Sequence, residues 1–262
     1  MFPSWCDDGE GVYDLCLSDD LDSLISCMLL EKVKGYKINY FYDFSSFWQI
    51  EKSSRPAIAV DVDLTKGKCW GNHVTALSQK DSVNEQAANL NSVLKISRDN
   101  YFEKYAGNTI LQIISYYGIP LPQKEEARMV LLAVDGSYRG FYSDKFRDTY
   151  LKWLEILEFD ELIQLLEYKT VEDFHWIIDK YNLYKKIYMN DQGILDTEIF
   201  IDALSDVLEL DLMLPWSQFE KVRDFKRKSL YLDSEDPLNK KKINKMVSCA
   251  LVRRNYLCYT TY

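Results

Sequence analysis

Three short apolar segments in the first 64 residues each end at or next to acidic residues. The segments "VYDLCLS" (12–18) and "PAIAVDVDL" (56–64) have the length and apolar content of buried strands. Between them, "LDSLISCMLLEKVKG" has the apolar spacing of a helix that stops at Gly35, and the aromatic segment "YKINYFYDF" (36–44) reads as a further strand. Strands that alternate with helices predict an α/β fold with a parallel sheet.

The second half of the chain has a different pattern. After residue 142, segments such as "DTYLKWLEILEFDELIQLLEY" and "TEIFIDALSDVLEL" have helical apolar spacing, and no strand signal of comparable strength follows. We therefore expect an α/β domain over residues 1–142 and a mainly helical C-terminal region over residues 143–262. With 262 residues and 47% apolar content, the chain is long enough to bury a core in both.

Several classes of protein are excluded by what the sequence lacks. The start, "MFPSWCDDGEG", has neither the basic nor the apolar part of a secretory signal, and the apolar stretches are too short to span a bilayer. The six cysteines include no C-x-x-C pair, which argues against a zinc site or a disulfide framework. The sequence thus predicts a cytoplasmic protein with reduced thiols and no membrane contact.

Charge is unevenly distributed along the chain. The net charge is −9, yet residues 221–254 carry 11 Lys and Arg against four Asp and Glu. One interpretation is solvated lysines on exposed helix faces. The other is a groove for an anionic substrate, formed by "KVRDFKRK" and "NKKKINK", with Tyr231 and Tyr256 available for base stacking.

Acidic residues and one histidine follow the predicted strands. Side chains just beyond the carboxyl ends of parallel strands converge on one crevice, where ligands bind. Six side chains lie at or near such positions: Asp20, Asp22, Asp61, Asp63, His73 and Asp135. Clustered carboxylates repel one another unless a cation neutralises them, and carboxylates with one histidine suit Mn²⁺ or Mg²⁺. Alternatively, "SDDLDS" is only a helix N-cap with an acid in the first turn.

The order of these motifs resembles a known family. The sequence runs through strand, D-x-D and helix, then "AVDVD", "GNHV", "KYAGNTILQIISYYG" and "LLAVDGSY". Over residues 12–142 this is similar to the N-terminal domain of the DHH phosphoesterase superfamily, which includes single-strand-specific exonucleases, small-oligonucleotide and cyclic-dinucleotide phosphodiesterases, and manganese pyrophosphatases. The resemblance implies a DHH-like domain that binds Mn²⁺ or Mg²⁺.

The resemblance also implies roles for individual residues. It assigns metal binding to Asp20, Asp22, Asp61, His73 and Asp135. It assigns a catalytic role to His73, Asp20 and Asp63. The two aspartates would complete the ligand shell of the metal or position the attacking water. The chain departs from the family at two ligand positions: Cys16 stands where a histidine is usual, and "GNHV" has one histidine where two adjacent ones are usual. The spacing between the second and third motifs is also short, and the C-terminal half lacks the glycine-rich signature that many members carry. These departures favour one metal ion over two, because a thiol is a poor ligand for a hard cation.

Three functions are compatible with this sequence. The first is a metal-dependent phosphoesterase that acts on a nucleotide, a cyclic dinucleotide or a short oligonucleotide. The second is a catalytically degenerate binding or inhibitory protein that engages a nucleotide or a protein partner without turnover. The third is a structural partner protein in which the acids only cap helices. A homo-oligomer is compatible with each of them.

Overall fold

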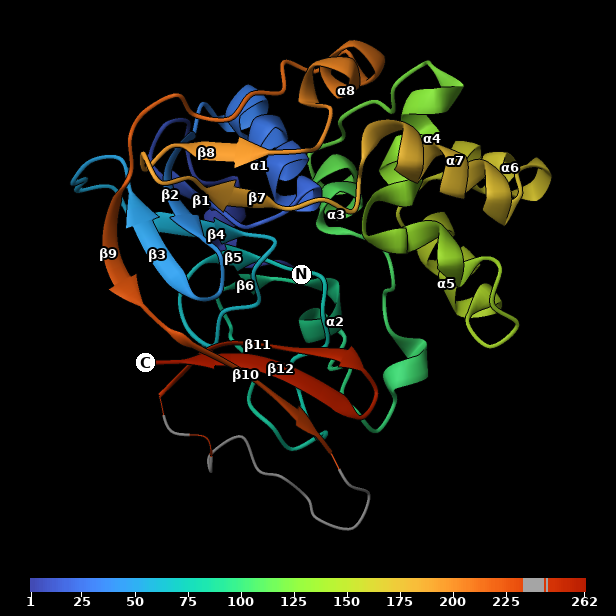
Figure 1. Cartoon of the computed structure of the whole chain (residues 1–262). Helices are drawn as coiled ribbons and strands as arrows, with labels where there is room; N and C mark the ends of the chain where they lie inside the picture. Colours follow the sequence, from blue (N-terminus) through green and yellow to red (C-terminus); the bar gives the residue numbers. More distant parts are fainter. Residues whose placement is uncertain (233–242, 244) are drawn as a thin grey trace. The chain divides into compact units, whose positions relative to one another are not determined.

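The computed structural model describes residues 1–232, 243 and 245–262, which fall into two compact units. Unit 1 consists of Met1–Ser18, Lys37–Tyr105 and Phe219–Tyr262, and unit 2 consists of Asp19–Tyr36 and Ala106–Gln218. Each unit therefore combines segments that are far apart in sequence (Figure 1). Residue 143, the predicted domain boundary, lies inside unit 2.

Unit 1 contains a seven-stranded sheet in the order β6-β5-β4-β1-β2-β3-β9. Its strands are β1 (Asp14–Leu17), β2 (Lys37–Tyr42), β3 (Ser46–Gln49), β4 (Ala57–Val60), β5 (Cys69–Trp70), β6 (Ala87–Ala88) and β9 (Glu220–Asp224). Strand β1 pairs in parallel with β2 and β4, the β4-β5 and β5-β6 pairs are also parallel, and β3 is antiparallel to both neighbours. This mostly parallel sheet confirms the predicted α/β class.

A second sheet in unit 1 is antiparallel. Its order is β10-β12-β11, and the strands are β10 (Lys226–Tyr231), β11 (Met246–Arg253) and β12 (Tyr256–Thr261). Backbone bridges join Leu64 to Ser248 and Val74 to Leu251, so loops of the first sheet are attached to β11. The expectation of a mainly helical C-terminal region is therefore wrong for its last part, where Glu220–Tyr231 and Met246–Thr261 are largely strand.

Unit 2 is mainly helical. Its elements are α1 (Leu21–Lys34), α3 (Thr109–Tyr116), α4 (Glu125–Ala133), the 3₁₀ helix η3 (Val134–Gly140), α5 (Arg147–Ile156), α6 (Asp160–Tyr168), α7 (Val171–Tyr181), α8 (Ile201–Leu208) and the hairpin β7 (Ile187–Met189) and β8 (Leu195–Thr197). Three short helices belong to unit 1: η1 (Ser4–Asp7), α2 (Leu90–Val93) and η2 (Tyr101–Glu103). Helix α1 ends at Gly35 in the left-handed region (φ 65°), which confirms the predicted stop.

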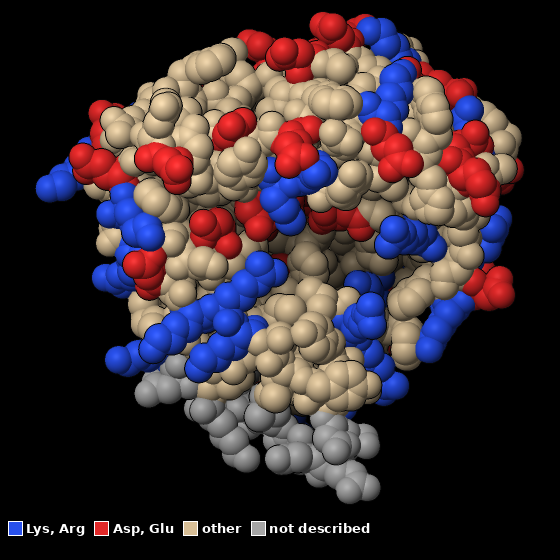
Figure 2. All heavy atoms as spheres, in the orientation of Figure 1, with Lys and Arg blue, Asp and Glu red and all other residues tan. Residues whose placement is uncertain are grey.

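The basic segment lies on strands rather than on helices. "KVRDFKRK" spans parts of β9 and β10, whose residues are all exposed, whereas most of "NKKKINK" lies outside the described residues. Figure 2 shows Lys and Arg side chains gathered over β9 and β10. Within the described ranges, no helix is long and apolar enough to cross a membrane.

Candidate metal centre

Asp22 lies in the first turn of α1, and its side chain is fully buried. Its Oδ2 accepts a hydrogen bond from the backbone N–H of Thr109 (2.8 Å), and its Oδ1 accepts one from that of Ile110 (2.9 Å). These are the first two residues of α3, so Asp22 interacts favourably with the dipoles of two helices. The carboxylate is therefore held in one orientation by backbone donors.

Asp135 is the second acid of unit 2, and it lies in η3 with left-handed backbone (φ 57°). Asn108, the N-cap of α3, donates through Nδ2 to the carbonyl oxygens of Leu131 (2.7 Å) and Val134 (3.3 Å), which fixes the chain just before Asp135. A carboxylate oxygen of Asp22 and one of Asp135 lie within 4.8 Å of each other. We call these two residues the acidic pair.

The acidic pair is electrostatically unfavourable without a counterion. Burial raises the pKa of Asp22 well above its usual range, and the charges of Asp135 and Asp20 raise it further, whereas the N–H groups of Thr109 and Ile110 lower it. A divalent cation would remove this repulsion. Because carboxylate oxygens are hard ligands, the pair suits Mn²⁺ or Mg²⁺ better than a soft metal.

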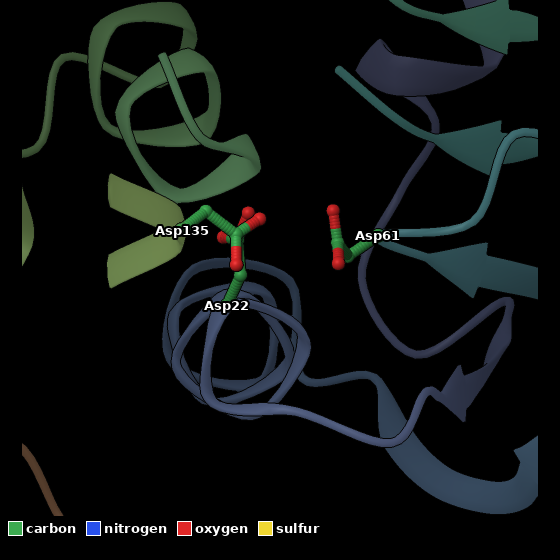
Figure 3. Close-up of side chains that lie close together, drawn as sticks. All are labelled: Asp22, Asp61 and Asp135. Carbon is green, nitrogen blue, oxygen red and sulfur yellow. The ribbon is translucent and has the colours of Figure 1, made fainter. Parts of the chain in front are cut away.

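Asp61 is the corresponding acid of unit 1. It follows β4 directly, it is buried, and its backbone is left-handed (φ 56°). Aspartate is one of the few residues with a side chain that adopts this conformation readily. Figure 3 draws Asp61 together with the acidic pair, whose two side chains point toward one another. Within unit 2 the acidic pair, and within unit 1 Asp61, are the carboxylates that could bind a cation.

Asp63 and His73 form a separate pair in unit 1. The Oδ2 of buried Asp63 lies 3.2 Å from Nδ1 of His73 and accepts from the backbone N–H of the same residue (3.1 Å). Its Oδ1 accepts from Nδ2 of Asn89 (2.6 Å). Both oxygens of Asp63 are thus engaged in positioning His73 and its loop. Among the described residues of unit 1, the possible ligand atoms of Asp61, Asp63 and His73 do not all lie within 4.8 Å of one another. These three residues therefore do not form a metal-binding cluster by themselves.

The close approach of Asp63 to its loop requires glycine at position 71. A Cβ atom on Gly71 would lie 2.2 Å from Oδ1 of Asp63, which is far inside contact distance. We expect Gly71→Ala to lower the free energy of unfolding by about 1–3 kcal/mol, because the carboxylate must give up bonds to His73 or Asn89. Chemical denaturation measures this loss, with Gly9→Ala as the control, since nothing lies within 4 Å of a Cβ there. Equal stability of the two variants would contradict the described role of Asp63.

Asp20 is the N-cap of α1, as the helix-cap interpretation predicted. Its Oδ1 accepts from the backbone N–H of Ser23 (3.2 Å). Its Oδ2 lies 3.1 Å from Nζ of Lys186, which also lies 3.0 Å from Oδ1 of Asp19. Partial burial lowers the pKa of Lys186, but Asp20 and Asp19 outweigh this effect and raise it. The charge of Asp20 is thus already balanced by a residue of the same chain.

Cys16 does not replace the histidine that the resemblance leads one to expect. It is buried in β1, and burial raises the pKa of its thiol. Its Sγ points to the carbonyl oxygen of Leu17 (3.9 Å). A thiol that stays protonated is a poor ligand for a hard cation.

Two residues of the site were not predicted from the sequence. Asn108 could have been recognised, because asparagine directly before a helical apolar stripe is a typical N-cap. No sequence signal identifies Lys186, which lies 166 residues from Asp20. Only the fold brings these two charges together.

Comparisons with protein-family models, curated proteins and solved structures found no match. The similarity to the DHH superfamily therefore stays a prediction from the motifs.

Proposed function

We propose that the chain is a phosphoesterase that depends on one Mn²⁺ or Mg²⁺ ion. Its substrate would be a nucleotide, a cyclic dinucleotide or a short oligonucleotide, as the resemblance to the DHH superfamily implies. One observation carries the proposal: the buried carboxylate of Asp22 lies next to that of Asp135, at a cost that a cation would remove.

The ligands in this proposal are those that the resemblance to the DHH superfamily implies. Asp22 and Asp135 would hold the cation together with Asp61, and His73 would be a further ligand. When bound, the cation polarises a phosphoryl oxygen and lowers the pKa of water. The backbone N–H groups of α3 hold Asp22 in place, so little reorganisation is needed on binding.

Lys186 favours one cation over two. A second ion would need Asp20 as a ligand, but that carboxylate caps α1 with one oxygen and pairs with the Lys186 ammonium through the other. The ammonium supplies a fixed positive charge where the second ion would otherwise be required. In this proposal Asp20 acts through Lys186 and does not bind metal itself.

The Asp63–His73 pair fits the proposed catalytic role of the histidine. When Nδ1 of His73 donates to Asp63, its Nε2 is left with a lone pair, which is the usual tautomer of a histidine that binds metal or accepts a proton. The side chain is 35% exposed, so Nε2 has access to a substrate or to water. Asp63 would be a positioning residue.

Hydrolysis assays test the proposal directly. The full chain is incubated with a chromogenic phosphodiester, a cyclic dinucleotide and short oligonucleotides, with Mn²⁺ and with excess chelator. We expect hydrolysis of at least one substrate in Mn²⁺ and a loss of at least about 100-fold in chelator, because the cation contributes several kcal/mol to the transition state. Activity that is insensitive to chelation would contradict the proposal.

The second candidate is a binding or inhibitory protein without turnover. It is favoured by the buried thiol of Cys16 and by the engagement of Asp20 with Lys186, because both remove elements of a two-ion centre. Stoichiometric Mn²⁺ binding without hydrolysis would support this candidate. No calorimetric response at millimolar Mn²⁺ would instead favour a protein whose acids only cap helices, as Asp20 and Asp22 do.

A further inference from the structure

Unit 1 contains a pocket that shares no residue with the proposed metal centre. Its volume is about 340 Å³, which is within the range of small-molecule sites. Cys16 of β1 and Ala59 of β4 line one side, and Tyr42, Phe225 and Tyr262 line another. We call it the aromatic pocket.

The aromatic side of the pocket is continuous. The ring centroids of Tyr42 and Phe225 are 5.3 Å apart in an edge-to-face arrangement, and those of Phe225 and Tyr262 are 5.6 Å apart. The hydroxyl of Tyr42 is engaged by Thr260 Oγ1 at 2.6 Å. The hydroxyl of this buried tyrosine is therefore already satisfied, and its ring forms part of the apolar wall.

The charged residues of the pocket are both cations. Lys68 and Arg223 line it, and no aspartate or glutamate of the described chain does. Lys68 lies over the ring of Tyr13 (5.2 Å), and Arg223 lies over the ring of Tyr262 (5.1 Å). Neither cation makes an ion pair with an acid in the part of the chain that the structure describes. Further Lys and Arg residues on β9 and β10 make the surroundings positive (Figure 2).

We propose that the aromatic pocket binds a nucleoside monophosphate group. The base would stack on the exposed ring of Tyr262 and pack against Phe225 and Tyr42, and the phosphate would pair with Lys68 and Arg223. Stacking on aromatic rings tolerates any base. We expect purines to bind somewhat more tightly than pyrimidines, because a purine buries a larger ring area. The inference does not depend on hydrolysis, because no proposed metal ligand lines the pocket.

Calorimetry with the full chain in chelator tests this site apart from the proposed reaction. We expect AMP to bind at low salt, and adenosine to bind about 25-fold more weakly, since two partly exposed ion pairs contribute about 1 kcal/mol each. Ala57→Trp, which fills the pocket from the start of β4, should weaken AMP binding at least about tenfold. Arg223→Ala should weaken it about fivefold. Lys228→Ala should leave it unchanged, because Lys228 lies on β10 and does not line the pocket.

Each arm has an outcome that would overturn the inference. Absence of AMP binding at millimolar concentration would do so, as would unchanged AMP binding by Ala57→Trp with a normal melting temperature. Equal affinity for AMP and adenosine would contradict the proposed pairing of the phosphate with Lys68 and Arg223. In one outcome, a trinucleotide competes with AMP for the wild-type protein and binds the Ala57→Trp variant more weakly. That result would show that the nucleoside monophosphate group bound in the pocket is the end of a nucleic acid. A trinucleotide that does not compete would identify the free nucleotide.

Discussion

Replacing Asp135 with asparagine is expected to make the metal-free protein more stable and to abolish its response to Mn²⁺. The change removes a negative charge next to the buried carboxylate of Asp22. Asparagine adopts the left-handed backbone at this position as readily as aspartate does. We expect the free energy of unfolding to rise by about 1 kcal/mol, which corresponds to about 2–4 °C in melting temperature.

The response to metal should change in the opposite direction. A ligand that binds only the folded chain stabilises it by about 2.7 kcal/mol at 100 times its dissociation constant. The wild-type protein should therefore melt at a higher temperature in Mn²⁺, and Asp135→Asn should not. Asp144→Asn, which changes an exposed acid in the same unit, is the matched control and should respond as the wild type does. A destabilised Asp135→Asn that still responds to Mn²⁺ would contradict the account.

The pH dependence of the metal-free protein follows from the same residue. The pKa of Asp22 is raised in the folded state, so the folded chain holds a proton that the unfolded chain has already lost. Stability should therefore fall as pH rises from the ordinary value of 3.8 toward the raised value. Melting in chelator across this range should show a smaller fall for Asp135→Asn, because one source of the raised pKa is gone.

The second large effect is expected at Asp61. Asp61→Asn keeps the size of the side chain and suits the left-handed backbone, but the neutral amide is a much weaker cation ligand. Mn²⁺-dependent hydrolysis should fall by at least about 100-fold, while the melting temperature in chelator stays within a few degrees of the wild type. Steady-state kinetics and thermal melting on the same samples measure both.

Asp63→Asn is the contrasting variant, two residues further along the same motif. Asp63 accepts hydrogen bonds from His73 and Asn89, so its replacement should lower the melting temperature in chelator. If Asp61→Asn retained full activity, Asp61 would not be a ligand. If Asp61→Asn and Asp63→Asn lost the same stability, the proposed division of roles between the two acids would fail.

Much of the first sheet was predictable because its strands β1, β2 and β4 are largely buried. All four residues of β1 are buried, and the three that follow Asp14 are apolar, as expected of a strand with both faces covered. The D-x-D turn and Gly35 then define both ends of α1 through ordinary capping chemistry. Short apolar runs that end in acids therefore gave the fold class and the positions of Asp22 and Asp61.

The strands of the basic segment were not predictable by the same means. All residues of β9 and β10 are exposed, so no alternation of apolar and polar residues marks them. The ion pair between Lys186 and Asp20 could not be predicted either, because such pairs depend on the fold and produce no periodic pattern in the sequence. The position of His73 has a similar origin: Asp63, Gly71 and Asn89 fix its loop through contacts that sequence spacing does not reveal.

Anomalous scattering from a crystal grown with Mn²⁺ is the most direct test of the central claim. We expect one peak, about 2.0–2.5 Å from carboxylate oxygens of Asp22 and Asp135, with the Lys186 ammonium still paired to Asp20. Two peaks about 3.5–4 Å apart would contradict the single-ion centre. No peak near Asp22 at saturating Mn²⁺ would contradict the metal site itself.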